Sequence, residues 1–215
     1  EAFYHEGQAL RGSILIVGPL LTRFGVGYMP KPGGDKIGRR RLDTHFDGFI
    51  KLGAHFEYDE SNFTYSVVAE RLKGTYMLLE EASVTGTSNV IMAAVLAEGK
   101  TTIYNAACEP YVQQLCRMLN AMGADIQGIG SNLITINGVT QLGGCSHTIL
   151  PDMIEIGSWI GLAAMTRSEI TIKNVGWEHL GIIPTIFRKL GISFEKVNDD
   201  IHIPAHTNGY EIQNY

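Results

Sequence analysis

The sequence predicts an α/β fold built from repeated β-α-β-α-β-β units, with the helices packed between copies and the sheets on the outside. Three observations lead to this prediction. A phrase of helix, glycine, strand, turn and strand recurs three times along the 215 residues. An apolar helix followed by a β-rich strand recurs between those copies. The glycines of the first phrase, Gly53, Gly123 and Gly191, are 70 and 68 residues apart, which indicates internal pseudosymmetry.

The first recurring phrase predicts a short helix and a hairpin in each copy. Its three instances are FIKLGAHFEYDESNFTYSV (49–67), RMLNAMGADIQGIGSNLITI (117–136) and FRKLGISFEKVNDDIHI (187–203). Each helix ends at a glycine, the residue that most readily adopts the left-handed conformation of a helix C-cap. The hairpin that follows has a turn of Ser-Asn or Asn-Asp character between two strands.

The second recurring phrase predicts an apolar helix followed by a strand. Its instances are GSILIVGPLLTRFGVGYMP (12–30), SNVIMAAVLAEGKTTIYNAA (88–107) and GSWIGLAAMTRSEITIKNVG (157–176). Ser88 and Ser158 stand where a helix N-cap is expected, because a serine hydroxyl accepts a hydrogen bond from the first turn of a helix. The residues that precede Ser88 should then form a loop.

A linking segment separates the second copy from the third. The stretch GVTQLGGCSHTILPD (138–152) is rich in small and polar residues and contains a proline. Such a composition is typical of a chain crossing between domains. We therefore expect a boundary near residue 150, with one domain at 1–150 and the start of another at 151–215.

The composition indicates a globular protein that binds small molecules. With 45% hydrophobic residues and a net charge of −5, the chain can bury a core and has no overall positive field for nucleic acid. Its apolar runs are shorter than the ~20 residues of a membrane span, and no signal peptide is evident, so we expect a cytoplasmic protein without a membrane partner. The three cysteines have no CxxC spacing, so we expect each to be a reduced, packed thiol. The histidines are scattered and lack the spacing of metal ligands, and we expect neither a metal site nor a cofactor.

The segment KPGGDKIGRRRLD (31–43) has the composition of an anion site. Its three glycines allow the backbone to turn tightly and to bring N–H groups close to a ligand. Three consecutive arginines, Arg39 to Arg41, add guanidinium groups that suit phosphate or carboxylate. From composition alone, an exposed loop with solvated arginines explains the segment equally well.

Longer motifs connect the chain to a known family. The stretches PGGDKIGRRRLDTHFDGFIKLGA, AAVLAEGKTTIYNAACEP and LPDMIEIGSWIGLAA resemble the UDP-N-acetylglucosamine 1-carboxyvinyltransferases, which are enolpyruvyl transferases. The resemblance implies an inside-out α/β barrel fold in which six copies of the repeat form two domains. Residues 1–150 would be most of the catalytic domain, and the partner of this piece would be the missing remainder of its own chain.

The resemblance also implies a reaction and its substrates. The family transfers the enolpyruvyl group of phosphoenolpyruvate to the 3-hydroxyl of UDP-N-acetylglucosamine and releases phosphate, in the first committed step of peptidoglycan synthesis. Asp35 stands where the family usually has the cysteine that fosfomycin alkylates. It would be the general acid of an addition followed by an elimination.

Further residues match family positions that bind substrate. Arg40 corresponds to the arginine that contacts phosphoenolpyruvate phosphate and the sugar nucleotide, and Asp43 to the residue that accepts from uracil. Arg11 corresponds to an arginine that reaches the sugar-nucleotide site. Arg41, Leu42 and Thr44 match the run that lines the uridine, and His45 matches a common histidine of the family. Val84, Thr85 and Gly86 match a second nucleotide contact before an apolar helix.

Three other functions fit parts of this pattern. A non-catalytic sugar-nucleotide-binding fragment would explain the missing part of the active site. A shikimate-3-phosphate enolpyruvyl transferase would share the chemistry, although the loop with Asp43 argues against it. An RNA-processing protein built from similar repeats would be expected to carry a basic face, which the net charge disfavours.

Overall fold

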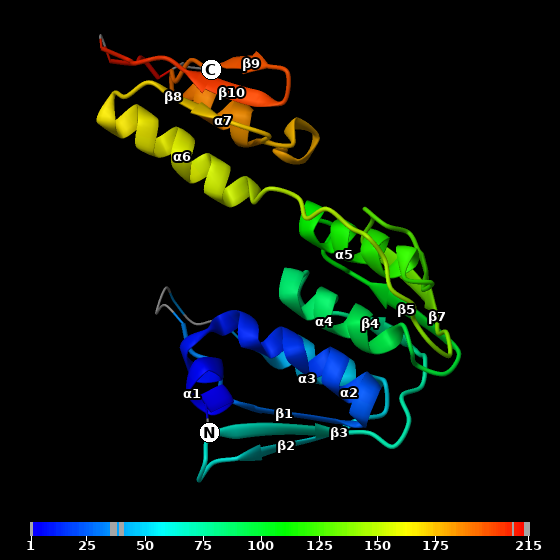
Figure 1. Ribbon diagram of the computed structural model, residues 1–215. Helices are drawn as coiled ribbons and strands as arrows, with labels where there is room; N and C mark the ends of the chain where they lie inside the picture. Colours follow the sequence, from blue (N-terminus) through cyan, green and yellow to red (C-terminus); the bar gives the residue numbers. More distant parts are fainter. Residues whose placement is uncertain (1, 35–37, 39–40, 208, 213–215) are drawn as a thin grey trace. The chain divides into compact units, whose positions relative to one another are not determined.

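The computed structural model describes residues 2–34, 38, 41–207 and 209–212, and it divides the chain into two compact units. The first unit is Glu1–His147 and the second is Thr148–Tyr215 (Figure 1). Each unit has its own hydrophobic core. That the first is a catalytic domain and the second the start of another remains a prediction.

The first half of unit 1 is a set of helices over an antiparallel sheet. Strand β3 lies between β1 and β2 and pairs antiparallel with both, so that Ser66 faces Tyr28 on one side and Glu57 on the other. In Figure 1, α2 and α3 lie over one face of this sheet. The elements are α1 (Ala2–Ala9), the 3-10 helix η1 (Arg11–Ile16), α2 (Val17–Phe24), β1 (Val26–Pro30), α3 (Asp43–Lys51), β2 (His55–Asp59) and β3 (Thr64–Val68).

The second half of unit 1 is a complete β-α-β-α-β-β unit. Its sheet has the order β4-β5-β7-β6, in which β4 and β5 are parallel and the other pairs are antiparallel. The elements are β4 (Tyr76–Leu78), α4 (Val84–Ala94), β5 (Lys100–Tyr104), α5 (Pro110–Ala121), β6 (Asp125–Gln127) and β7 (Leu133–Asn137).

Unit 2 repeats the arrangement of the first half of unit 1. Its antiparallel sheet has the order β8-β10-β9, which corresponds to β1-β3-β2. The elements are α6 (Met153–Thr166), β8 (Ile170–Ile172), η2 (Trp177–His179), α7 (Ile183–Lys189), β9 (Glu195–Val197) and β10 (Asp200–Ile203). The predicted α/β repeat is confirmed, and within the described part of the chain only the middle copy carries the leading strand.

The predicted glycine caps are confirmed. Gly53, Gly123 and Gly191 have φ angles of 95°, 102° and 82°, and each follows the end of a helix. A residue with a Cβ is strained in this region, so glycine is the residue that lets the chain leave the helix and enter the hairpin.

The expected serine N-caps were wrong. Helix α4 begins at Val84, and the Ser83 hydroxyl accepts from the Gly86 N–H at 3.1 Å. Ser88 lies one turn inside, where its hydroxyl donates to the Val84 carbonyl at 2.8 Å. Because an earlier hydroxyl already caps the helix, the chain becomes helical sooner than the repeated phrase suggested.

Helix α6 departs from the expectation in the same way. The Asp152 carboxylate accepts from the Ile154 N–H at 2.8 Å and caps the helix. Ser158 lies inside α6 and donates to the Ile154 carbonyl at 3.0 Å. Both helices therefore begin five or six residues earlier than expected, at Val84 and Met153.

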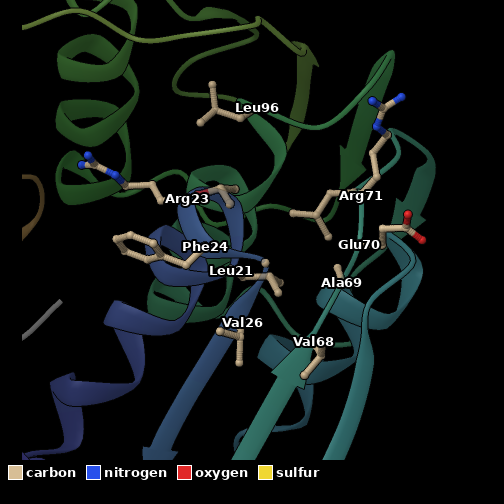
Figure 2. Close-up of a pocket in the computed structure, with 12 residues that line it drawn as sticks. Leu21, Arg23, Phe24, Val26, Val68, Ala69, Glu70, Arg71 and Leu96 are labelled. Atoms are coloured by element: carbon tan, nitrogen blue, oxygen red, sulfur yellow. The ribbon is translucent and has the colours of Figure 1, made fainter.

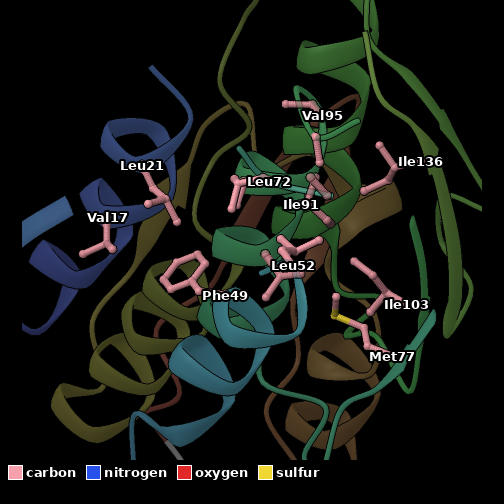
Figure 3. Packing of buried hydrophobic residues seen from close by; sticks show 14 of the residues in the cluster. Val17, Leu21, Phe49, Leu52, Leu72, Met77, Ile91, Val95, Ile103 and Ile136 are labelled. Atoms are coloured by element: carbon pink, nitrogen blue, oxygen red, sulfur yellow. The ribbon is translucent and has the colours of Figure 1, made fainter. Parts of the chain in front are cut away.

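The core of unit 1 joins its two sheets through the helices between them. Figure 3 shows side chains of α2, α3, α4 and β5 meeting there, including Leu21, Phe49, Ile91 and Ile103, which are at most 2% exposed. Helices α3 and α4 approach closely at Gly48, where a Cβ would lie 2.2 Å from Val90 Cγ2. This close crossing fixes the starts of α3 and α4 relative to one another.

Candidate functional site

Two segments that the family resemblance identified come together at the helix starts. Asp43 is the first residue of α3, and Gly86 lies in the first turn of α4. A Cβ on Gly86 would lie 2.8 Å from Thr44 Cγ2, so the two helices touch at this point. The site residues near 43 and near 85 are therefore neighbours, although about 40 residues separate them in the sequence.

Arg11, Arg41 and Asp43 form one polar group beside these helix starts. Arg11 Nη2 donates to the Arg41 carbonyl at 2.9 Å, which ties η1 to the end of the candidate loop. The Arg41 guanidinium donates to the Asp43 carboxylate, and this hydrogen bond raises the pKa of Arg41. Both partners are about half exposed, so the ion pair is accessible to a ligand that could exchange with either group.

A hollow of about 350 Å³ lies against the same group. Its polar walls come from Arg11, Lys31, Asp43 and Asp47. Its apolar walls come from side chains of α3 and the adjacent sheet together with two neighbouring residues: Pro32, Leu42, Phe46, Ile50, Phe56, Tyr58 and Tyr65. The two cationic groups suit negative charge on a ligand, the two carboxylates suit its N–H or O–H donors, and the aromatic surface suits a flat ring.

His45 lies under this surface rather than on it. Its side chain is 1% exposed. The ring nitrogen Nδ1 is 3.0 Å from Asn89 Nδ2, and Nε2 is 3.3 Å from Thr85 Oγ1. Burial lowers the pKa of His45 to about 4, with a smaller contribution from the positive charge of Arg11. Both nitrogens of this neutral imidazole contact side chains of α4, so His45 joins the start of α3 to the start of α4.

The start of α4 is a helix turn rather than the loop that we expected. Val84, Thr85 and Gly86 are its first three residues, with Val84 and Thr85 half-buried and Gly86 buried. The N–H groups of a first helical turn lack partners within the helix and attract anions. Here the Ser83 hydroxyl engages the N–H of Gly86.

The remaining predicted residues divide into two groups. Leu42 is buried at 9% exposure and Thr44 is half-buried at the contact with Gly86. Asp35 and Arg40 lie outside the described residues, so their predicted roles are carried by the sequence alone.

A larger hollow of unit 1 lies elsewhere. It measures about 650 Å³, and its lining includes residues of the α2–β1 turn and the segment after β3. Figure 2 shows the guanidinium groups of Arg23 and Arg71 on opposite sides of it, directed away from each other. Its lining includes Val26 at the start of β1, whereas the lining of the smaller hollow includes Lys31, which follows the end of β1. No candidate residue lines the larger hollow, so size does not identify the site.

Sequence reasoning missed Asn89. This residue is 0% exposed within α4, and its side chain contacts η1, α2 and α3. The available signal was an amide directly before the apolar run of this helix, because a buried amide needs several hydrogen-bond partners and usually joins elements together.

Cysteines and acidic groups give no metal centre in the described part of the chain. No group of three or more histidine, cysteine or acidic side chains comes together there. Cys116 is buried, and burial raises the pKa of its thiol to about 11. Cys108 and Cys145 are exposed, so the expectation that all three cysteines are packed was wrong for these two.

Among the described helices, none combines the length and the apolar character needed to cross a bilayer.

Sequence comparison assigns the family. Residues 2–213 match the family described as EPSP synthase (3-phosphoshikimate 1-carboxyvinyltransferase). The chain belongs to the EPSP synthase family. Within this family, similar curated proteins carry the name UDP-N-acetylglucosamine 1-carboxyvinyltransferase. The relative from Bacteroides thetaiotaomicron is 64% identical over 215 residues, and the one from Porphyromonas gingivalis is 61% identical. These matches confirm the resemblance that the motifs indicated.

The matches also define how much of the family's length is present. Each of the two alignments covers 100% of this chain and 49% of the relative. The chain therefore spans about half the length of the curated relatives it matches.

Solved structures of the EPSP synthase family confirm the fold. The enolpyruvyl transferase NikO from Streptomyces tendae matches 92% of this chain and 48% of its own with a TM-score of 0.76 at 17% identity. An EPSP synthase from Acinetobacter baumannii matches 91% of this chain and 46% of its own, with a TM-score of 0.61 at 21% identity. At these identities the likeness concerns the fold.

Proposed function

We propose that this chain is part of an enzyme that transfers the enolpyruvyl group of phosphoenolpyruvate to the 3-hydroxyl of UDP-N-acetylglucosamine and releases phosphate. The reaction would be the first committed step of peptidoglycan synthesis and would take place in the cytoplasm without a cofactor. The rest of the active site would come from the missing remainder of the same chain. The observation that carries this proposal is the shared name of relatives that match the chain along its whole length at more than 60% identity.

The geometry of the hollow beside α3 supports a nucleotide site. Arg11 and Lys31 supply positive charge, and Tyr58 and Tyr65 supply flat apolar surface. In the proposed complex, Asp43 accepts a hydrogen bond from uracil, while Arg41, Leu42 and Thr44 line the uridine. Arg41 donates to Oδ2 of Asp43, and a carboxylate has a second oxygen that can accept a ligand N–H.

The remaining predicted site residues are assigned to groups of the substrates by their chemistry. Arg40 contacts the phosphate of phosphoenolpyruvate, for which a guanidinium offers two parallel donors. Val84, Thr85 and Gly86 receive the sugar nucleotide at the N-terminus of α4, where the helix dipole favours negative charge.

The proposed general acid is Asp35. In the addition step, C3 of phosphoenolpyruvate takes the carboxyl proton, the sugar oxygen bonds to C2, and the hydroxyl proton passes to a base in the missing remainder of the chain. Elimination then removes a proton from C3, re-forms the C2–C3 double bond and breaks the C2–O bond to phosphate. An aspartic acid with a pKa of about 3.9 is ionised at neutral pH, and protonating it costs roughly 4 kcal/mol. A closed, water-poor cleft and a multiply negative substrate would raise its pKa, so Asp35 should bind its proton when phosphoenolpyruvate binds.

The first experiment measures phosphate release by the full-length gene product from phosphoenolpyruvate with UDP-N-acetylglucosamine or with shikimate 3-phosphate. We expect release with the sugar nucleotide only. Asp35→Asn should lower kcat about 100-fold or more, because the acid is lost while the size of the side chain is kept. Asp125→Asn on β6, which is exposed, is the matched control.

Fosfomycin provides a second test on the same protein. Because Asp35 replaces the alkylated cysteine, activity should persist in the presence of fosfomycin and no covalent adduct should form at this position. Release with shikimate 3-phosphate instead would assign the other chemistry of the family. Nucleotide binding without any phosphate release would assign a non-catalytic binding module, and full activity of Asp35→Asn would remove the acid role.

A further inference from the structure

We propose that Asn89 is a positioning residue: through His45 it fixes the Thr85 hydroxyl as a hydrogen-bond donor that faces the sugar nucleotide. The inference rests on the proposed function for the identity of the ligand. The direction in which Thr85 donates is inferred from the hydrogen bonds of Asn89 and His45.

The Asn89 amide has one permitted orientation. Its Oδ1 is 2.9 Å from the N–H of Gly18, which can only donate, and its Nδ2 is 2.8 Å from the carbonyl of Ile14, which can only accept. Exchanging the amide oxygen and nitrogen would set donor against donor and acceptor against acceptor. The backbone of η1 and α2 therefore determines which atom of Asn89 faces His45.

That orientation determines the tautomer of His45. The second proton of Asn89 Nδ2 faces His45 Nδ1 at 3.0 Å, so Nδ1 must accept. A neutral imidazole has one donor and one acceptor, which leaves its proton on Nε2. Burial favours the neutral ring, since His45 is 1% exposed.

The tautomer in turn determines what Thr85 can do. His45 Nε2 is 3.3 Å from Thr85 Oγ1 and donates to it. The hydroxyl proton of Thr85 then points elsewhere, and no acceptor for it is present among the described residues. Thr85 is half-buried in the first turn of α4, where the N–H groups also attract negative charge. The hydrogen bonds from Asn89 through His45 to Thr85 form a relay. This relay presents an O–H donor that suits a phosphate oxygen.

Close packing keeps the relay in place. A Cβ on Gly18 would lie 2.6 Å from Asn89 Oδ1, so only glycine at this position lets α2 approach the amide. The hydrogen bonds of Asn89 span 44, 71 and 75 residues of sequence. The direction of the Thr85 donor is therefore set by the packing of three elements around α4.

The first test is nitrogen NMR of His45 in the full-length protein without substrate. We expect a protonated Nε2 and an unprotonated Nδ1. A His45 ring that carries its proton on Nδ1 would overturn the proposal, whatever reaction the protein catalyses. Because this measurement needs no substrate, its outcome is separate from that of the proposed function.

The second test compares variants by their KM for the sugar nucleotide. Thr85→Val should raise this KM roughly tenfold, since it removes one hydrogen bond to a charged group, while Thr85→Ser should restore it. Ser88→Ala is the control on the same helix, because the Ser88 hydroxyl serves its own helix. An unchanged KM in Thr85→Val would overturn the proposal.

Asn89→Asp tests the direction of the relay. A carboxylate can only accept, so His45 should move its proton to Nδ1 and Thr85 should turn to donate to Nε2. We expect the changed tautomer together with the KM defect of Thr85→Val. A folded Asn89→Asp protein with an unchanged tautomer or an unchanged KM would show a structural role only and would overturn the proposal. If this variant does not fold, the tautomer of the parent and the Thr85 pair decide the question.

Discussion

His45 and Asp43 lie two residues apart at the start of α3, yet burial gives them different chemistry. The Asp43 carboxylate is about half exposed and pairs with Arg41 in contact with solvent. His45 is 1% exposed and held between Asn89 and Thr85. Solvent screens the first interaction strongly and the second very little. Arg41 and Asp43 can therefore exchange their partners for groups of a ligand. His45 can act on a ligand only through the residues that it contacts.

Lowering the pH from 7 to 4 should destabilise unit 1 through His45. Its pKa in the fold is about 4, below the usual 6.5, so the unfolded chain takes up the proton first. The free energy of unfolding therefore falls as the pH drops through this window, by about 3 kcal/mol in full. Denaturant unfolding of the parent and of His45→Gln at several pH values checks this. The variant should show a shallower pH dependence, and the exposed His55→Gln should retain the steep one.

The three cysteines should react with a thiol reagent at two different rates. Cys108 and Cys145 are exposed, whereas Cys116 is buried with a thiol pKa of about 11. Only the thiolate is nucleophilic, so Cys116 should stay unmodified at pH 8 until denaturant is added. Absorbance titration with a disulfide reagent measures the rates. Rapid modification of all three cysteines in the native chain would contradict the described burial of Cys116.

At the scale of elements, glycines decide how closely the helices of unit 1 approach. Gly18 lets α2 approach Asn89 of α4, and Gly48 lets α3 approach Val90 of the same helix. Both contacts lie in helices whose glycines cost stability when considered alone, because glycine disfavours the helical state. The gain is a tertiary contact that brings the starts of α3 and α4 together.

Gly48→Ala should destabilise the protein although alanine favours helices. The new Cβ would lie 2.2 Å from Cγ2 of Val90, which is 0% exposed and cannot move aside. Overpacking of this kind costs about 1–3 kcal/mol and exceeds the helix gain of up to about 1 kcal/mol. Gly161→Ala in α6 is the matched control, because its Cβ would meet Phe187 only at 4.0 Å and should stabilise slightly. Urea unfolding of both variants compares them, and equal effects would contradict the described crossing.

At the scale of the whole molecule, the two units differ in how completely they bury their apolar helices. Helix α4 has most of its residues buried against α2, α3 and α5. Helix α6 is also strongly apolar, yet Ile154, Leu162 and Met165 are 61%, 47% and 83% exposed. This apolar surface is open in the 215-residue chain, and an open apolar surface promotes association.

The 215-residue chain should therefore self-associate and bind a hydrophobic dye. Met165→Lys together with Ile154→Lys should reduce both properties, because each places a charge on the exposed surface of α6. Analytical ultracentrifugation and dye fluorescence make the measurement. Thr171→Lys, at an exposed position on β8, controls for the effect of added positive charge alone. A parent chain that is monomeric and does not bind the dye would contradict the prediction.

Much of the fold could be predicted from the sequence because its signals are local. The cap glycines, the hairpins and the apolar helices each occupy fewer than about 20 residues, and the repeat makes each copy support the others. The helix starts were less predictable, since Ser83 and Ser88 are both chemically able to cap and the structure uses the earlier one. The candidate residues near 43 and 85 came from family motifs, and no local pattern indicated that they meet.

The sequence by itself determined the repeated α/β units, the glycines that end the helices, the glycine- and arginine-rich loop and the family. These depend on backbone preference and on residue types in order, which a linear sequence contains. Only the tertiary structure decided that His45 is buried, that Asn89 joins three elements and that the Thr85 hydroxyl contacts His45 at the start of α4. Burial and hydrogen-bond direction depend on groups up to 75 residues apart, and packing alone brings those groups together.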